Sequence, residues 1–143
     1  MLKQLCVENI AIVQQLDVAF SDGLTIVTGE TGAGKSLMLG AIATVFGKRV
    51  SPAEVVRQGE KRGRIELTFD LPEDTAPQYV EVQELLAEMG VELFDDERHV
   101  TVSREFSGAS SRVRVNGVPV ALDAISRLRP FVVDLHGQHD LTS

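Results

Sequence analysis

The 143-residue sequence has no tryptophan, one tyrosine and six phenylalanines, although apolar residues make up 43% of it. Its core must therefore be mostly aliphatic. Cys6 is the only cysteine, which excludes an internal disulfide, and we interpret it as a small core residue. No stretch approaches the roughly eighteen apolar residues that a membrane-spanning helix requires. The first residues carry no signal-peptide pattern, so we expect a cytoplasmic protein.

The formal net charge of −7 argues against a chain that is basic overall and binds nucleic acid through that charge. The charge is unevenly spread, however. Residues 48–64 hold six basic and two acidic side chains, whereas residues 70–97 hold ten acidic and no basic ones. The length is that of one domain.

A glycine-rich stretch fits the pattern G-x-x-x-x-G-K-[ST] of phosphate-binding loops, and it consists of Gly29, Glu30, Thr31, Gly32, Ala33, Gly34, Lys35 and Ser36. Residues 24–28, before it, are apolar enough for a buried strand. Residues 37–46, after it, are apolar nearly all round, which is typical of a buried helix. Strand, loop and helix in this order are the context that the motif requires.

The residue types explain the chemistry that we expect of this loop. Its glycines let the backbone approach a ligand closely, and the N–H groups at the helix N-terminus favour an anion. Lys35 would reach the β- and γ-phosphates, and the Ser36 hydroxyl would bind Mg²⁺. The alternative is a glycine-rich turn that binds nothing.

Alternating and helical patterns predict the remaining elements. We expect strands over residues 2–8, 13–20, 64–70, 98–106, 111–115 and 131–135, helices over 80–89 and 122–128, and a helical turn at 51–54. Asn116-Gly117 is a strong turn signal, and Pro130 is expected to help end the helix before it. These elements predict an α/β fold, a mixed sheet with an adjoining antiparallel β layer.

The position of the motif near the start of the chain, the β-rich stretch after its helix and a later glutamine resemble an ABC-type ATPase head, and more closely the SMC-like ATPases. Five strings carry a closer resemblance, to the RecN family of bacterial double-strand-break repair ATPases: residues 9–13, 28–36, 56–59, 115–117 and 136–139. The resemblance covers essentially the whole chain.

That resemblance implies a P-loop NTPase whose head is assembled from both ends of a long chain, around a coiled coil. Residues 1–143 would be the N-terminal lobe, with the Walker A motif at 29–36 and the Q-loop near 136–140. The coiled coil and the C-terminal lobe, with its catalytic glutamate, would be missing, so we expect this chain alone to be inactive. The implied cofactors are ATP and Mg²⁺. The implied partners are DNA at double-strand breaks, the C-terminal lobe and a second head, in the bacterial nucleoid.

By the same resemblance, Gln138 is the Q-loop glutamine, which would help to hold Mg²⁺ and the attacking water. The alternative is an exposed loop amide. Asp134, His136, His139 and Asp140 could instead form a metal site, but the sequence shows no distant second pair of ligands. His99 is interpreted as a residue on a strand face.

We consider two functional hypotheses for Arg57. It could contact the nucleotide, or it could form a DNA-binding patch with Lys61, Arg62 and Arg64. A solvated loop is the plain alternative. Arg112 and Arg114 share one strand face, which could face DNA or solvent. Two other functions stay open: a DNA tether in which ATP is mainly a dimerisation clamp, and a transporter ATPase subunit.

Overall fold

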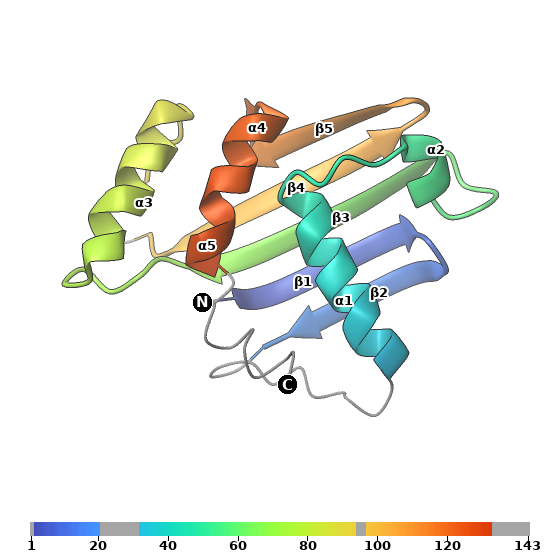
Figure 1. Ribbon diagram of the computed structural model, residues 1–143, viewed down its shortest axis with the longest axis horizontal. Helices are drawn as coiled ribbons and strands as arrows, with labels where there is room; N and C mark the ends of the chain where they lie inside the picture. The colour runs from blue at the N-terminus through green and yellow to red at the C-terminus, as the bar shows by residue number, and fades with distance from the viewer. Residues whose placement is uncertain (1, 21–31, 94–96, 133–143) are drawn as a thin grey trace.

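The computed structural model describes residues 2–20, 32–93 and 97–132. In this part of the chain, six strands form one sheet (Figure 1). The strands are β1 (Leu2–Ile10), β2 (Val13–Ala19), β3 (Arg62–Asp70), β4 (His99–Ser107), β5 (Ser110–Val115) and β6 (Val118–Val120). Their order across the sheet is β2-β1-β3-β4-β5-β6, and every neighbouring pair is antiparallel.

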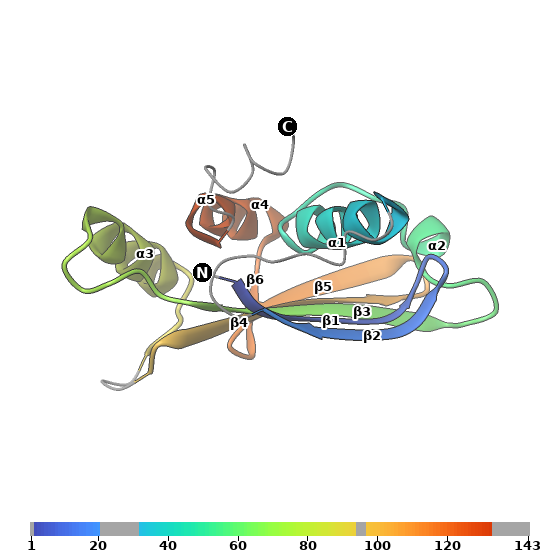
Figure 2. The same ribbon diagram turned by 90° about the horizontal axis from the view of Figure 1, so that it is seen from below.

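The helices lie on one side of this sheet, as the view in Figure 2 shows. They are α1 (Gly32–Val45), α2 (Pro52–Val55), α3 (Pro77–Glu88), α4 (Leu122–Ile125), the 3₁₀ turn η1 (Ser126–Leu128) and α5 (Arg129–Val132). α1 crosses the sheet and contacts β3 and β4, while α3 lies on the far side of α4 and α5 from α1 (Figures 1 and 2). No helix of the described residues is long and apolar enough to cross a membrane.

Alternation along the strands separates a core face from an outer face. In β3, Ile65, Leu67 and Phe69 are fully buried, while the residues between them are partly exposed. The core face packs against one side of α1, which buries Met38, Ala41, Ile42 and Val45. Burying an aliphatic or aromatic side chain contributes about 1.5–3 kcal/mol, so this layer supplies much of the stability of the fold.

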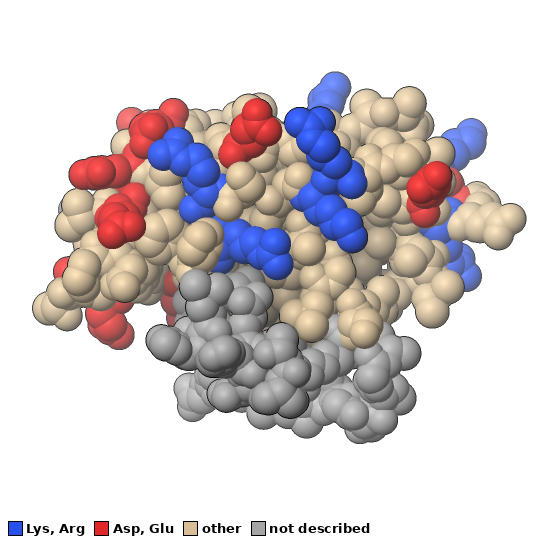
Figure 3. Space-filling model, viewed as in Figure 1, with Lys and Arg blue, Asp and Glu red and all other residues tan. Residues whose placement is uncertain are grey.

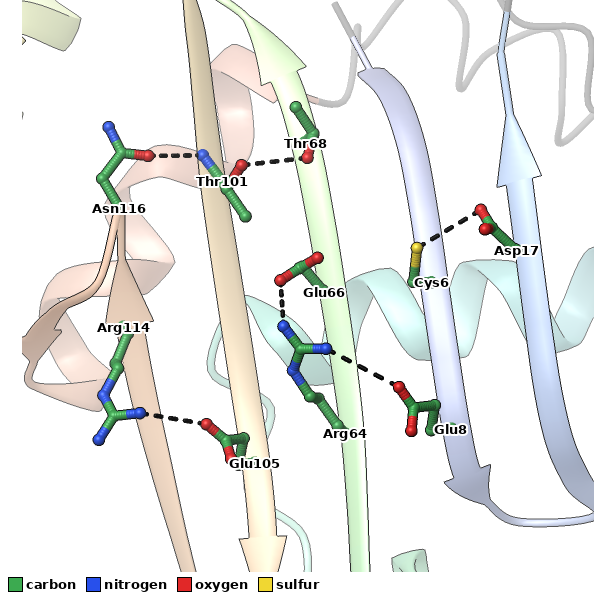
Figure 4. Close-up of polar contacts among 10 residues, drawn as sticks. All are labelled: Cys6, Glu8, Asp17, Arg64, Glu66, Thr68, Thr101, Glu105, Arg114 and Asn116. Carbon is green, nitrogen blue, oxygen red and sulfur yellow. Dashed lines mark hydrogen bonds and ion pairs between the residues drawn. The ribbon is translucent and has the colours of Figure 1, made fainter.

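Turn chemistry fixes the register of the strands. Asn116 and Gly117, with φ of 48° and 84°, form the two-residue turn between β5 and β6, as the sequence predicted. The Asn116 side chain also accepts a hydrogen bond from the Thr101 main-chain N–H at 2.8 Å, which ties the turn to β4 (Figure 4).

The predicted α/β class and its antiparallel layer are confirmed. The strand expected at 24–28, which would make the sheet mixed, lies outside the described residues. The prediction of a strand at 131–135 was wrong for its first two positions, because Phe131 and Val132 belong to α5. Pro130 does not end the helical segment: a proline is tolerated in the first turn of a helix, where its missing N–H has no partner to lose, and it stands there in α5.

Candidate nucleotide site

The phosphate-loop motif runs directly into α1. Gly32, Ala33, Gly34, Lys35 and Ser36 form the first residues of this helix. The expected helix after the loop is thus present, and Ser36 is exposed. Gly29, Glu30 and Thr31 lie outside the described residues, as do Gln138 and the histidine and aspartate cluster around it.

The start of α1 suits a phosphate ligand. The first four N–H groups of a helix have no partner within the helix, and the aligned peptide dipoles make this end positive. The first turn contains no acidic residue that would compete with an anion. Its composition therefore fits the triphosphate and Mg²⁺ that the motif implies.

The other end of α1 is capped by the main chain. Gly47, with φ of 104°, follows the helix, and its N–H donates to the Thr44 oxygen at 3.2 Å. The Lys48 N–H donates to the Ala43 oxygen at 3.1 Å. This pair of bonds is a Schellman motif, in which a glycine adopts the left-handed conformation without steric cost.

A buried arginine, which the sequence analysis did not single out, also reaches this end. The Arg104 Nη1 atom donates to the main-chain oxygens of Thr44 at 2.8 Å and Lys48 at 2.7 Å. Burial lowers the pKa of the Arg104 guanidinium below its ordinary value. The sequence did carry a signal. Arg104 occupies a core-face position of β4, between Val102 and Phe106, and the other residues on this face of the strand are apolar.

The structure brings together two of the strings that carry the family resemblance. The Arg57 N–H donates to the Asn9 oxygen, and the Ala11 N–H donates to the Val55 oxygen, each at 2.8 Å. Asn9 and Ala11 have positive φ, so the turn between β1 and β2 has an unusual backbone that this contact supports. The Arg57 main chain is therefore fixed at the tip of the β1–β2 hairpin.

The outer face of the sheet carries a row of alternating charges. The register aligns Glu8, Arg64, Glu105 and Arg112 across four strands. As Figure 4 shows, Arg64 pairs with Glu8 at 3.8 Å and with Glu66, and Arg114 pairs with Glu105 at 3.2 Å. Exposed pairs of this kind contribute about 0–1 kcal/mol each, so they do not dominate the stability of the sheet.

Two further arginines on this face, Arg62 and Arg112, are exposed and have no ion-pair partner among the described residues. Together with Arg64 and Arg114 they border a hollow of about 460 Å³. The predicted shared face of Arg112 and Arg114 is confirmed, since Val113 and Val115 point to the core.

The structure also tests the predictions for metal ligands, for His99 and for Cys6. No group of three or more histidine, cysteine, aspartate or glutamate side chains could hold a metal ion in the described ranges. His99 lies on an exposed strand face, beside Asp70 at 2.5 Å, as predicted. Cys6 is not a core residue: it lies half-buried on the outer face, because the alternation of β1 turns it away from Leu5 and Val7.

Comparison with protein families gives a match over residues 4–121 to a family model described as an AAA domain. This match covers most of the sheet and all of α1. The chain belongs to the AAA domain family. The predicted resemblance to RecN is also confirmed, because the curated proteins similar to this chain include RecN DNA repair proteins of several bacteria.

RecN of Bacillus subtilis is 39% identical over 98% of this chain, and RecN of Haemophilus influenzae is 35% identical over 97% of it. The alignments span 23% and 24% of those relatives. The chain thus spans about a quarter of the length of the curated relatives it matches.

Two solved structures resemble the fold. An SMC head bound to the C-terminal winged-helix domain of ScpA matches with a TM-score of 0.56 at 15% identity, over 88% of this chain and 38% of that one. The recombination mediator RecF, solved with ATPrS, matches with a TM-score of 0.56 at 16% identity, over 87% of this chain and 29% of that one. At these identities the likeness concerns the fold alone.

Proposed function

We propose that this chain is the ATP-binding lobe of a RecN-like DNA-repair ATPase. The observation that carries the proposal is the complete phosphate-loop motif running into α1, the helix that crosses the sheet. The AAA domain match and the similarity to RecN proteins support a nucleotide as the ligand of that motif.

In this proposal the residues act as the motif assigns them. The N–H groups between Gly29 and Gly34 bind the phosphates, Lys35 contacts the β- and γ-phosphates, and the Ser36 hydroxyl binds Mg²⁺. Gln138 orients the attacking water. Because the chain spans about a quarter of its relatives, hydrolysis is assigned to the complete head, in which a C-terminal lobe completes the site.

The same proposal makes ATP the link between two heads. One head holds the triphosphate on its phosphate loop, and the second head covers it, so that binding favours the dimer and hydrolysis releases it. Sedimentation of a RecN-length protein with ATP, with ADP and without nucleotide tests this step. We expect dimers with ATP only, and equal mass in all three conditions would contradict the dimerisation step.

DNA is the proposed partner of the outer sheet face, at the nucleoid. Arg62 and Arg112 are available there for phosphate contacts, and the hollow between them has a surplus of arginine over carboxylate. On the helical side, acidic side chains gather over α3, while Lys and Arg side chains lie over the middle of the face (left and centre in Figure 3).

Calorimetric titration with Mg-ATP tests the nucleotide site. We expect saturable binding by the wild-type chain, and loss of that binding in Lys35→Ala, because the side-chain charge on the phosphates is removed. Lys61→Ala is the matched control, since it removes a lysine from the loop before β3. Equal affinity in Lys35→Ala and Lys61→Ala would show that the ligand does not occupy the loop. Circular dichroism on all three proteins confirms that they are folded.

A further inference from the structure

Arg104 is a buried cation on the core face of β4. It is 2% exposed and lies among the aliphatic and aromatic side chains that support α1. Removing a charge from water has a high free-energy cost unless hydrogen bonds and an opposing charge compensate for it. No carboxylate among the described residues pairs with this guanidinium, so its compensation comes from another source.

That source is the C-terminal end of α1. The main-chain oxygens of Thr44 and Lys48 accept hydrogen bonds from Arg104, and the last carbonyls of a helix carry negative partial charge. The cation thus meets the negative end of the helix dipole inside the core. Arg104 thus binds the last turn of α1 through the Thr44 oxygen and the main chain just after it through the Lys48 oxygen, which ties the position of α1 to the position of β4.

The orientation of the guanidinium is set by the sheet. The Ser111 hydroxyl of β5 accepts hydrogen bonds from Nε at 3.3 Å and from Nη2 at 3.2 Å. The guanidinium carbon stacks over the Phe106 ring, 4.9 Å from the ring centroid. A planar group held on three sides has little freedom to rotate. The β4–β5 hairpin therefore determines where the C-terminal end of α1 sits.

We propose that Arg104 is a positioning residue for the nucleotide: it fixes the axis of α1 and thereby aims the phosphate loop at the other end. The inference rests on the proposed function of that loop. A helix of 14 residues is a rod about 21 Å long. If its C-terminal end is not held, the whole helix can tilt, and the tilt displaces the phosphate loop at its N-terminal end. Misplacing a binding group by about 1 Å is enough to weaken its action strongly.

The test compares Arg104→Met, Arg104→Lys and Leu86→Ala with the wild-type chain. Arg104→Met keeps an unbranched stem and removes the guanidinium, while Arg104→Lys keeps the charge and loses the fork. Leu86 is buried in α3, away from α1, so Leu86→Ala is a control for lost stability. Each protein is measured for melting temperature, for Mg-ATP affinity by calorimetry, and for amide hydrogen exchange without nucleotide.

We expect Arg104→Met to raise the Kd for Mg-ATP about tenfold or more, and Arg104→Lys to recover part of the loss. Leu86→Ala should lower the melting temperature without changing the Kd. A wild-type Kd in Arg104→Met would overturn the inference and leave Arg104 a purely structural residue. If Arg104→Met does not fold, Arg104→Lys and Ser111→Ala provide the same comparison with milder changes.

Hydrogen exchange separates this inference from the proposed function. If the wild-type chain binds no Mg-ATP, the function proposed for the isolated lobe fails, and exchange still tests the link to α1. Faster exchange in α1 than in α3 for Arg104→Lys, with the reverse order for Leu86→Ala, supports the positioning role. The same exchange pattern in both variants rejects it.

Discussion

The Arg104 guanidinium lies 2.8 Å from the main-chain oxygen of Thr44, a residue 60 positions earlier in the chain. This contact joins the middle of the sheet to the end of the helix that begins in the phosphate-loop motif. Under the proposed function, the two ends of α1 therefore have different tasks: the N-terminal end binds the nucleotide, and the C-terminal end is held by the sheet. Changes at the fold end can be separated from changes at the ligand end by measuring stability and affinity on the same variants.

Replacement by alanine should have opposite effects on stability at Gly47 and at Gly40. In Gly47→Ala the new Cβ would lie 3.1 Å from the Leu122 oxygen at a positive φ, so we expect the free energy of unfolding to fall by about 1–2 kcal/mol. Gly40 lies inside α1 with open space around it, and Gly40→Ala should raise that free energy by about 0.5–1 kcal/mol. Urea denaturation measures the free energy of unfolding of both variants. A change of the same sign in the two would contradict the different backbone conformations of Gly47 and Gly40.

The close approach of β3 to the β1–β2 turn predicts a second sensitive glycine. A Cβ on Gly63 would lie 2.7 Å from both the Asn9 oxygen and the Ile10 Cδ1 atom. We expect Gly63→Ala to cost about 2–3 kcal/mol, because backbone must move to relieve the overlap. Ser103→Ala, on the outer face of β4, should stay within about 0.5 kcal/mol. Thermal unfolding of the two proteins measures the difference. Equal melting temperatures would mean that the β1–β2 turn moves away from the new Cβ without loss of stability.

The reactivity of Cys6 should depend on Asp17. Burial and the hydrogen bond to the Asp17 carboxylate, at 3.4 Å, raise the pKa of the Cys6 thiol from 9.0 to about 11. Alkylation with iodoacetamide should therefore be slow at pH 8 and rise with a midpoint near pH 11. In Asp17→Asn the midpoint should move down. Mass spectrometry follows the rate, and an unchanged profile in Asp17→Asn would remove the carboxylate as a cause.

The same pKa shift predicts how stability changes at alkaline pH. The folded protein holds the Cys6 proton more tightly than the unfolded chain does, so this contribution is fully present below pH 9. It is lost as the pH rises from 9 to about 11. Urea titrations at pH 8 and pH 11, with Cys6→Ser as the control, measure the difference. A wild-type loss no larger than that of Cys6→Ser would contradict the linkage.

Arg62 and Arg112 provide the test of the DNA face. Removing both should weaken binding to a short duplex and reduce the slope of log K against log salt by about 2, one for each lost phosphate contact. Arg129→Ala is the control, because it removes an exposed arginine from the helical side. Fluorescence anisotropy at several salt concentrations measures the slope. An unchanged slope in the double variant would place the phosphate contacts elsewhere.

Local patterns were sufficient to predict most of the fold. The alternation of Ile65, Leu67 and Phe69, and the Asn116-Gly117 turn, each encode their structure within a few residues. The run at 131–135 failed because a short apolar segment has no period that distinguishes a strand from a helix. Its helical start depends on the residues packed around it, which a single sequence does not display.

The motif of the candidate site can be recognised from the sequence, but the contacts that hold its helix in place cannot. The motif up to Ser36 is read directly from spacing, because phosphate binding requires those residue types in that order. The roles of Arg104 and Thr44 depend on contacts between β4 and α1, which are far apart in sequence. In the sequence, the only indication of a structural role for Arg104 is that it is a charged residue on the otherwise apolar face of β4.

The strand order has a consequence for how the protein is made. β1 and β2 leave the ribosome before β3, but β1 pairs with β3, and Leu5 lies opposite Leu67. At about 5–20 residues per second, synthesis of the roughly 50 residues from the end of β2 to the end of β3 takes on the order of 3–10 s. During that interval the β1 edge of the hairpin, which β3 later covers, is open to pairing with other nascent chains. Completion of β3 ends this exposure, so a translational pause before residue 70 would prolong the period of greatest aggregation risk.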